Sequence, residues 1–504
     1  MIRRLLAAAL AAMLLALPMG AFAAEGAVYE VFVASFYDGN GDGIGDLAGL
    51  TEKIPYVAGL GVGGIWMMPI SPSPSYHKYD VTDYMAVDPA YGTLEDFDAL
   101  VEACHASGLS VILDLVINHT SREHPWFASA CASIGVEPCG QETCACKPLC
   151  REHNPYVNYY TFTHDSSMHA VSGTDWYYLG NFGDHMPDLN LENPDVRGEI
   201  ADILEFWLKR GADGFRLDAV TSYCEGNTAK NVQVLAWLRE TVKSIEPDAY
   251  LVGEAWTDEA SILSLYASGV DSLFAFPFAG PTGKLVADLR NEDGAGYARA
   301  LEAWYSAVEK ANPEAKNAPF LSNHDMARMA GTLRFDAQAE KLAAAAYLLL
   351  PGMPYLYYGE ELGMSGSGAD ENKRLPMLWS AMNDDGTCLP PANADQSQRQ
   401  KQGVAEQDAQ ADSLLNCYRE ILHLRNALPV FQHGAVQAAD LGQDALCGYI
   451  LSDEHMRVLV AHNFSREEIS CLVQGEMLKV LGEGELVGDM LTLGGLSSAV
   501  IQLK

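Results

Sequence analysis

The 504-residue sequence predicts an α/β protein: a (β/α)8 TIM barrel with a small inserted domain after the third strand and a C-terminal antiparallel β domain. Three observations predict this fold. Short apolar runs alternate with longer helical patterns from about Val28 to about Arg425, which indicates parallel strands joined by helices. One connection is far longer than the others. After Leu424 the pattern changes to short strands separated by glycine turns.

The expected barrel strands are short apolar runs with helical patterns, such as 94–107 and 195–209, between them. Eight strands alternating with helices are typical of a closed barrel. We therefore assign residues 24–118 and 184–425 to the barrel. The expected strands are Val28–Val33, Gly64–Met67, Ser110–Asp114, Gly214–Asp218, Tyr250–Glu254, Ser272–Ala275, Pro319–Ser322 and Pro354–Tyr358.

The long connection between the third and fourth strands, residues 119–183, is predicted to form a Cys-rich inserted subdomain, because structureless loops of that length are uncommon. Five of the eleven cysteines lie in it: Cys131, Cys139, Cys144, Cys146 and Cys150. Two or more disulfide bridges are the favoured interpretation. A zinc site is the alternative, although no histidine stands at zinc-finger spacing.

The remaining cysteines give two further expectations. Cys447 and Cys471 could pair within the C-terminal β domain, residues 426–504. Because the total of eleven is odd, at least one thiol stays free. Cys104, in an apolar helical pattern, is the expected free thiol.

Residues 1–23 are predicted to be a secretory signal peptide. Arg3 and Arg4 precede an apolar run from Leu5 to Leu17 and a small-residue cleavage site at Ala21–Ala23. The apolar run is too short for a convincing membrane span. The net charge of −35 would repel nucleic acid and anionic membranes but does not disfavour a neutral sugar. We expect a secreted monomer without a membrane span or a nucleic-acid partner.

Ionisable side chains gather at the ends of four expected strands, where barrel enzymes place their active sites. Converging carboxylates shift one another's pKa values, as acid and nucleophile chemistry requires. Two carboxylates that flank a glycosidic bond can protonate the leaving oxygen and attack the anomeric carbon. The residues are His119 after the third strand, Arg216 and Asp218 on the fourth, Glu254 on the fifth, and His324 and Asp325 on the seventh.

These segments resemble the shared sequence regions of the α-amylase family of glycoside hydrolases over nearly the whole mature chain. The resemblance implies a retaining hydrolase of α-glucans such as starch and maltooligosaccharides. Asp218 would be the nucleophile, Glu254 the proton donor, and Asp325 a third carboxylate that binds sugar hydroxyls and favours ring distortion. The carboxyl groups of the catalytic pair would lie about 5–5.5 Å apart.

The resemblance also implies substrate-binding residues around the cleaved sugar. Arg216 would lie against the nucleophile and hold it ionised. Tyr79 would form an aromatic platform beneath the sugar, and His119 and His324 would bind its hydroxyl groups. Asp80, next to Tyr79 in the same segment, belongs to this substrate-binding set.

Three further segments bear on the bond that is cleaved. Met186–Asn190 resembles a region of family members intermediate between oligo-1,6-glucosidases and neopullulanases. Ala219 directly follows the nucleophile, where α-1,6-acting relatives more often carry valine, so this resemblance favours α-1,4 bonds. Arg374–Trp379, in contrast, resembles a segment common in oligo-1,6-glucosidases. We expect an endo-acting α-amylase. An exo-acting α-glucosidase or oligo-1,6-glucosidase, a transglycosylase and, more remotely, a non-catalytic carbohydrate-binding protein are the alternatives.

The loop from Asp38 to Asp46 predicts a structural Ca²⁺ site. Its oxygen donors stand at alternate positions with glycines between them, as in the first nine positions of an EF-hand loop. Position twelve is Gly49 instead of glutamate, so the loop is not an EF-hand. The expected ligands are Asp38, Asn40, Asp42, the backbone carbonyl of Ile44, and Asp46.

A second calcium site often lies between the barrel and the inserted domain in the resembling family. Asn118 matches the asparagine of that site. Ser222 stands where calcium-binding amylases usually have a histidine that supplies a backbone oxygen. Asn118 is therefore only a candidate ligand.

Overall fold

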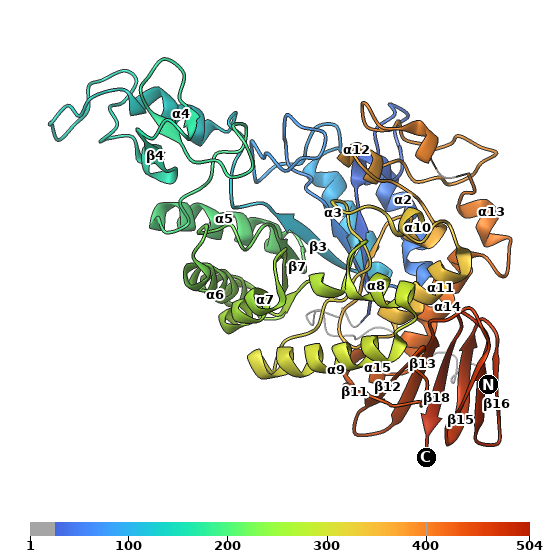
Figure 1. Cartoon of the computed structure of the whole chain (residues 1–504). Coiled ribbons are helices and arrows are strands. Elements are labelled where there is room, and N and C mark those ends of the chain that lie inside the picture. Colours follow the sequence, from blue (N-terminus) through green and yellow to red (C-terminus); the bar gives the residue numbers. More distant parts are fainter. Residues whose placement is uncertain (1–25, 400) are drawn as a thin grey trace, which may run out of the picture.

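The computed structural model describes residues 26–399 and 401–504, so the expected signal peptide lies outside the described residues. In this part of the chain, seven parallel strands form one curled sheet in the order β10-β1-β2-β3-β7-β8-β9 (Figure 1). The strands are β1 Val28–Val31, β2 Gly64–Met67, β3 Ser110–Leu115, β7 Gly214–Leu217, β8 Tyr250–Gly253, β9 Ser272–Leu273 and β10 Tyr355–Tyr357.

Residues 318–320 close this sheet into a barrel. Ala318 forms a parallel bridge with Phe274, just beyond β9, and Phe320 forms one with Tyr355 in β10. The Tyr355 N–H donates to the carbonyl of Pro319 at 2.8 Å. The predicted (β/α)8 barrel is thus confirmed, with its seventh strand in chain order reduced to two isolated bridges.

The strands before Asp218 and Glu254 each end one residue earlier than predicted. β7 ends at Leu217 and β8 at Gly253, so Asp218 and Glu254 lie just beyond the ladder. Their backbones still follow it, because the Asp218 N–H donates to the carbonyl of Leu115 and the Glu254 N–H to that of Leu217, at 3.2 and 2.9 Å. The two carboxylates therefore stand on the barrel rim with rigid strands beneath them.

Helices cover the outside of the barrel (Figure 1). α5 illustrates why they form: Asn193 caps its first turn, Pro194 begins it, and apolar side chains such as Ile200 and Trp207 recur on one buried face. The longer helices are α2 Leu47–Leu60, α3 Leu94–Ala106, α5 Pro194–Lys209, α6 Thr228–Ile245, α7 Glu259–Leu265, α8 Lys284–Asn291, α9 Gly294–Ala311, α11 Ala337–Leu348 and α14 Leu414–Ala427. Shorter ones are α10 Met329–Thr332, α12 Asp370–Lys373, α13 Val404–Asp408 and α15 Val430–His433.

None of the helices in residues 26–399 and 401–504 combines the length and the apolar character that crossing a bilayer requires.

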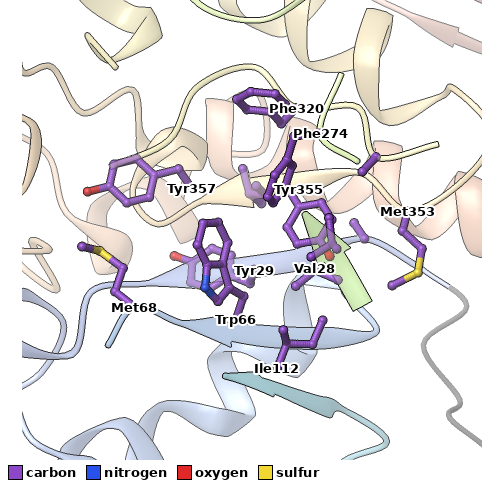
Figure 2. Packing of buried hydrophobic residues seen from close by; sticks show 14 of the residues in the cluster. Val28, Tyr29, Trp66, Met68, Ile112, Phe274, Phe320, Met353, Tyr355 and Tyr357 are labelled. Atoms are coloured by element: carbon purple, nitrogen blue, oxygen red, sulfur yellow. The ribbon is translucent and has the colours of Figure 1, made fainter. Parts of the chain in front are cut away.

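Aromatic side chains fill the interior of the barrel (Figure 2). Phe274 packs against Trp66, Phe320 and Tyr355, with ring centroids 5.6, 5.4 and 4.7 Å apart. All four rings are buried. The Trp66 indole N–H, in addition, donates to Asp114 Oδ2 at 3.3 Å, which links this core to the polar residues at the rim.

The insert after β3 projects from the barrel, on the side opposite the C-terminal strands (Figure 1). It contains α4 Pro125–Ile134 and a small antiparallel sheet of β4 Phe162–Thr163, β5 His169–Ala170 and β6 Tyr177–Tyr178. Phe127 packs against Tyr160 and Tyr178, with ring centroids 4.9 and 4.8 Å apart. These rings belong to the same hydrophobic core as the barrel residues, so the insert is packed onto the barrel.

The C-terminal region folds into two antiparallel sheets, of order β11-β12-β13-β18-β15 and β14-β17-β16, with apolar side chains such as Leu459, Leu491 and Ile501 between them. Its first strand begins at Ala435, after α14 and the short α15. The strands are β11 Ala435–Ala438, β12 Leu446–Ser452, β13 Arg457–Asn463, β14 Ile469–Leu472, β15 Gly475–Leu481, β16 Gly484–Val487, β17 Met490–Leu493 and β18 Ser498–Leu503.

The structure shows none of the expected disulfides. All eleven cysteines lie in the described residues and are free thiols. Cys447 packs into the main core from β12, whereas Cys471 lies on β14 in the cluster between the two C-terminal sheets, so the two thiols belong to different cores. Cys104 is a buried free thiol in α3, as expected.

Candidate active site

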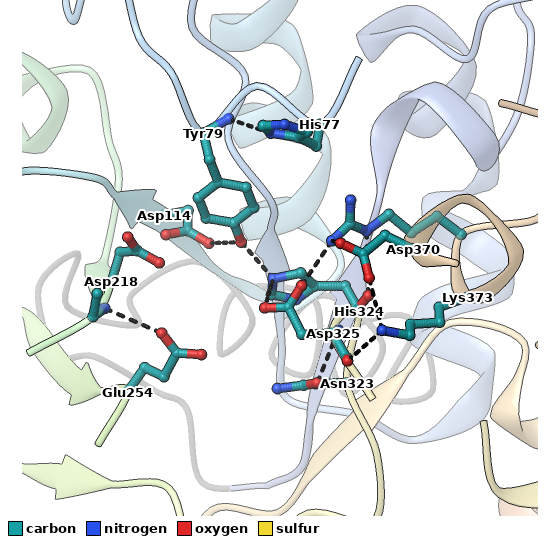
Figure 3. A network of polar contacts seen from close by, with 12 residues as sticks. His77, Tyr79, Asp114, Asp218, Glu254, Asn323, His324, Asp325, Asp370 and Lys373 are labelled. Carbon is teal, nitrogen blue, oxygen red and sulfur yellow. Dashed lines mark hydrogen bonds and ion pairs between the residues drawn. The ribbon is translucent and has the colours of Figure 1, made fainter. Parts of the chain in front are cut away.

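A cleft of about 430 Å³ opens at the C-terminal ends of the barrel strands. Five of the predicted site residues line it, and Arg216 and His324 lie buried directly beneath them. Figure 3 shows how the acidic residues converge on this cleft. The lining consists of His77, Tyr79, His119, Phe182, Met186, Asp218, Ala219, Thr221, Ser222, Glu254, Trp256, Asp325, Asp370 and Arg374.

Arg216 is the buried cation at the centre of the acidic residues. Its side chain is 1% exposed. Nη1 lies 2.8 Å from Asp114 Oδ1 and 2.6 Å from Asp218 Oδ1, and Nη2 lies 2.9 Å from Glu254 Oε2. One guanidinium therefore contacts three carboxylates, which places Asp218 and Glu254 next to each other.

The two carboxyl groups at the end of β7 and β8 have different electrostatic surroundings. Burial raises the pKa of both, and the charge of Arg216 opposes that effect. For Asp218 the hydrogen bond from Arg216 lowers the pKa further. The negative charge of Asp325 raises the pKa of both groups, and for Glu254 the charge of Asp218 raises it further. Glu254 is thus the better placed to hold a proton, and Asp218 the better placed to remain ionised.

Asp325 lies on the opposite wall between two cations. Its Oδ2 is 3.1 Å from His324 Nε2, and its Oδ1 is 2.7 Å from Arg374 Nη2. Burial alone would raise the pKa of Asp325, but these two neighbours hold it well below its usual range. Lys373 also donates to the backbone carbonyl of Asp325 at 2.8 Å. The carboxylate is therefore ionised and fixed in position.

His324 connects this wall to the first barrel strand. Its Nδ1 lies 2.5 Å from Glu30 Oε1. Burial would lower the pKa of His324, but the charges of Asp325 and Glu30 raise it to about 10. At neutral pH the imidazolium consequently carries a proton on both nitrogens. Tyr79 stacks on this ring, with centroids 5.4 Å apart and planes 13° apart.

Of the remaining predicted residues, Tyr79 and His119 line the cleft and Asp80 lies outside its lining. The Tyr79 hydroxyl contacts His324 Nε2 at 2.7 Å and donates to Asp114 Oδ2 at 3.0 Å. His119 donates from Nε2 to the Tyr79 carbonyl at 3.1 Å, and burial lowers the pKa of His119 to about 4, so its ring is neutral. Asp80 does not line the cleft. It is buried and accepts hydrogen bonds from Ser73 and Ser75, which hold the loop that carries Tyr79.

Sequence reasoning missed several residues of this network. Glu30 and Asp114 are charged residues inside apolar strand patterns, and that contrast was the available signal. The sequence singles out the segment that contains Arg374 but does not indicate that Arg374 is a partner of Asp325. Trp256 follows Glu254 closely in sequence, and its 53% exposure at the rim is visible only in the folded structure.

The predicted calcium loop follows the first barrel strand. Gly41 and Gly43 adopt φ of 84° and 94°, a left-handed conformation that glycine adopts readily and that folds the loop tightly. Asp38 accepts from the N–H groups of Gly41 and Gly43 at 2.7 and 2.8 Å, and Asp42 from that of Ile44 at 2.8 Å. The carboxylates of Asp38 and Asp42 thus hold an exposed turn by accepting backbone N–H groups of the same loop.

Asp46 and Asn118, two further predicted calcium ligands, make other hydrogen bonds. Asp46 caps α2, because its Oδ1 accepts from the Gly49 N–H at 2.6 Å and its Oδ2 from two N–H groups of the loop at 3.1 Å. Asn118 is buried at the start of the insert, with its Nδ2 3.4 Å from Asp188 Oδ1. Burial raises the pKa of Asp188 to about 7.

Comparisons with known proteins place this geometry among carbohydrate-active enzymes. The family described as "Alpha amylase, catalytic domain" matches residues 30–434. Alpha-amylase 3 of Dictyoglomus thermophilum is 36% identical over 454 residues, covering 87% of this chain and 85% of that protein. An oligo-1,6-glucosidase of Heyndrickxia coagulans is 29% identical, covering 88% and 92%. The solved structure of Eubacterium rectale Amy13B superimposes with a TM-score of 0.90 at 40% identity, covering 95% of each chain.

Replacement of Arg216 by methionine should destabilise the fold, and more so at higher pH. Burial already raises the pKa values of these three carboxyl groups above their unfolded values, and loss of the guanidinium raises them further. Such groups lose their contribution to stability as the pH rises through those pKa values. We expect the free energy of unfolding to fall by about 3–5 kcal/mol at pH of about 8 and by less at pH of about 5, measured by urea denaturation.

Arg210→Met is the matched control, because Arg210 pairs with Asp98 in an exposed contact at 2.8 Å. Its loss should cost no more than about 1 kcal/mol at either pH. Equal and pH-independent losses in the two variants would contradict the role of Arg216.

Proposed function

The chain belongs to the alpha-amylase family of glycoside hydrolases, and we propose that it is a secreted, retaining α-amylase that cleaves α-1,4 bonds inside starch-like glucans. The carrying observation is the catalytic pair: Asp218 and Glu254 touch one guanidinium at 2.6 and 2.9 Å on the floor of an open cleft. Their electrostatic surroundings differ, so Asp218 acts as the nucleophile and Glu254 as the proton donor.

In the first half of the reaction, Asp218 attacks the anomeric carbon while Glu254 transfers its proton to the glycosidic oxygen. The carbon–oxygen bond breaks, and the sugar becomes esterified to Asp218. In the second half, the ionised Glu254 takes a proton from water, whose oxygen attacks the same carbon and releases Asp218. Configuration is retained because both attacks invert it.

The opposite wall supplies substrate binding. Asp325 is held by His324 and Arg374, so it can accept hydrogen bonds from two sugar hydroxyls without moving. Preorganised charge of this kind assists the step in which positive charge develops on the sugar ring. Tyr79 presents its ring to the same sugar, and His119 stands beside it in the cleft lining.

Action inside a chain is favoured by the shape of the cleft. A second hollow of about 420 Å³ adjoins the first and shares Trp256 and Asp325 with it. Trp256 is 53% exposed and stacks on Phe276, with ring centroids 5.3 Å apart. A polymer can therefore continue past the acidic residues over an aromatic surface, whereas an enzyme that removes terminal units needs a closed end.

An oligo-1,6-glucosidase is the second candidate. It is favoured by the similarity to the Heyndrickxia coagulans enzyme of that name and by the segment Arg374–Trp379. In transglycosylation, a sugar hydroxyl replaces water in the second half of the reaction. Both alternatives use the same acidic residues and differ in their products.

Export and calcium belong to the same proposal. The signal-like residues 1–23 support secretion, since a polymer too large for uptake has to be degraded outside the cell.

For Ca²⁺, the donor chemistry of the loop fits a hard cation: side-chain oxygens of Asp38, Asn40 and Asp42 and the carbonyl of Ile44. When bound, the ion would supply only structural stabilisation. Asn118 stays a candidate for a second ion, with Asp188 as its partner.

Product analysis on soluble starch, maltotriose and isomaltose tests the function. We expect internal scission of starch into short α-oligosaccharides, and a loss of rate of about 10²–10⁴-fold in Glu254→Gln, which lacks the proton donor. On α-glucosyl fluoride, whose leaving group needs little protonation, Glu254→Gln should keep most of its activity for the glycosylation step, whereas Asp218→Asn should lose it. Glucose released mainly from isomaltose would favour the second candidate. No cleavage of any α-glucan would refute the proposal.

Trp256→Ala should separate polymer from short substrates. Removing the indole takes away stacking with a sugar unit beyond the acidic residues, so kcat/KM on starch should fall by about 10-fold while that on maltotriose changes by less than about 2-fold. Phe335→Ala is the control, because that exposed ring lies outside the cleft lining. Equal losses on both substrates would contradict an extended groove.

Calcium should stabilise the fold through the loop after β1. At a concentration 100-fold above Kd, the ion adds about 2.7 kcal/mol to the free energy of unfolding, so EGTA should lower the Tm. Asp42→Asn should weaken this response by removing one charge. Asp440→Asn is the matched control, because Asp42 and Asp440 each accept a backbone N–H two residues ahead at 2.8 Å. An unchanged Tm with EGTA would rule out the site.

A further inference from the structure

A loop of the insert has an interior made of sulfur atoms. It joins α4 to the short 3-10 helix at Pro155–Tyr159 and contains no helix or strand between them. From Glu137 to Cys150 every residue is exposed except four. Those four are Cys139, Cys144, Cys146 and Cys150, and Cys150 is fully buried. The loop therefore has no apolar core that would account for its fold.

The four sulfurs converge on one point. All four Sγ atoms lie within 4.8 Å of one another. The Sγ atoms of Cys144 and Cys150 are 3.6 Å apart, far longer than the roughly 2.05 Å of a disulfide bond. A tetrahedral ion with metal–sulfur bonds of about 2.3 Å holds its sulfurs about 3.8 Å apart. The spacing thus fits four ligands around one centre better than two covalent pairs.

Neighbouring groups support thiolates at this point. The Cys150 N–H donates to Cys144 Sγ at 3.5 Å. His153 Nδ1 lies 3.1 Å from Cys150 Sγ and 3.7 Å from Cys139 Sγ, so its N–H can donate to a metal-bound sulfur. Outer hydrogen bonds of this kind orient metal ligands and stabilise their charge.

The base of the loop is closed independently of the sulfurs. Arg151 forms two hydrogen bonds with the carboxylate of Glu137, at 3.0 and 2.7 Å, and its N–H donates to the carbonyl of Val136 at 3.1 Å. Asn154, which follows, is buried and donates to Ser133 Oγ at 2.8 Å. The two ends of the loop are thereby held together, and a cross-link at its tip is what the exposed segment lacks.

We propose that Cys139, Cys144, Cys146 and Cys150 bind one structural Zn²⁺ ion. Four thiolates in a tetrahedral arrangement are a closed site for this ion, with no position left open for catalysis. Binding releases the thiol protons to solvent and forms four zinc–sulfur bonds. The ion substitutes for the missing apolar core, as metals do in other small scaffolds. None of the four cysteines lines the cleft.

The test is metal analysis of the chain purified without chelator or reductant. We expect about one zinc per chain in the wild type and less than about a tenth of that in Cys139→Ser and Cys146→Ser. Cys131→Ser is the matched control, because Cys131 lies on α4 outside the group of four, and it should keep its zinc. Replacement of the zinc by Co²⁺ should give the visible absorption of a tetrahedral cobalt–thiolate centre in the wild type and not in Cys146→Ser.

A second measurement separates loss of the ion from misfolding. Starch hydrolysis by Cys146→Ser should stay within about 2-fold of the wild type, while proteolysis between Glu137 and Arg151 becomes faster. A zinc-free chain in which these cysteines are oxidised pairwise, by intact mass and peptide mapping, would overturn the proposal in favour of disulfides. Iron in place of zinc, four free thiols without metal, or zinc retained by Cys146→Ser would overturn it as well. None of these outcomes bears on the hydrolase proposal, which rests on Asp218 and Glu254.

Discussion

The contact of one buried guanidinium with three carboxylates is the constraint on which the active site depends. Arg216 is 1% exposed and reaches Asp114, Asp218 and Glu254 within 2.9 Å. Burying that many negative charges without a cation would cost more than the fold can supply. Because Arg216 stands inside β7, the carboxylates that it binds are brought to the ends of β3, β7 and β8. Charge balance in the barrel wall therefore fixes the positions of Asp218 and Glu254, the proposed catalytic pair.

A second series of charged side chains supports the opposite wall of the cleft. Glu30, His324, Asp325 and Arg374 alternate in sign and lie in contact, although β1 and the segment after α12 are more than 300 residues apart in sequence. The Tyr79 hydroxyl contacts both His324 of this series and Asp114, which binds Arg216. The hydrogen bonds of Tyr79 thus connect the two walls of the cleft. The aromatic core that contains Trp66 supports the strands that carry them.

The same barrel rim carries loops whose stability comes from other sources. The loop after β1 folds around aspartate oxygens and glycine turns, and the insert loop folds around cysteine sulfurs. Hard oxygens and soft thiolates select different ions, so calcium and zinc would not compete for these two sites. In each case a polar, exposed segment lacks the apolar area that ordinarily holds a loop in one conformation.

The sequence by itself determined the barrel and five of the residues that line its cleft, because strand–helix alternation and strand-end positions are local patterns. Only the tertiary structure decided their partners: Glu30 for His324, Arg374 for Asp325, and serines instead of substrate for Asp80. It also changed the interpretation of the cysteines, since pairing depends on distances between sulfurs that no spacing along the chain reveals. Contacts between distant segments form only when the barrel closes, and for that reason they leave little trace in the order of residues.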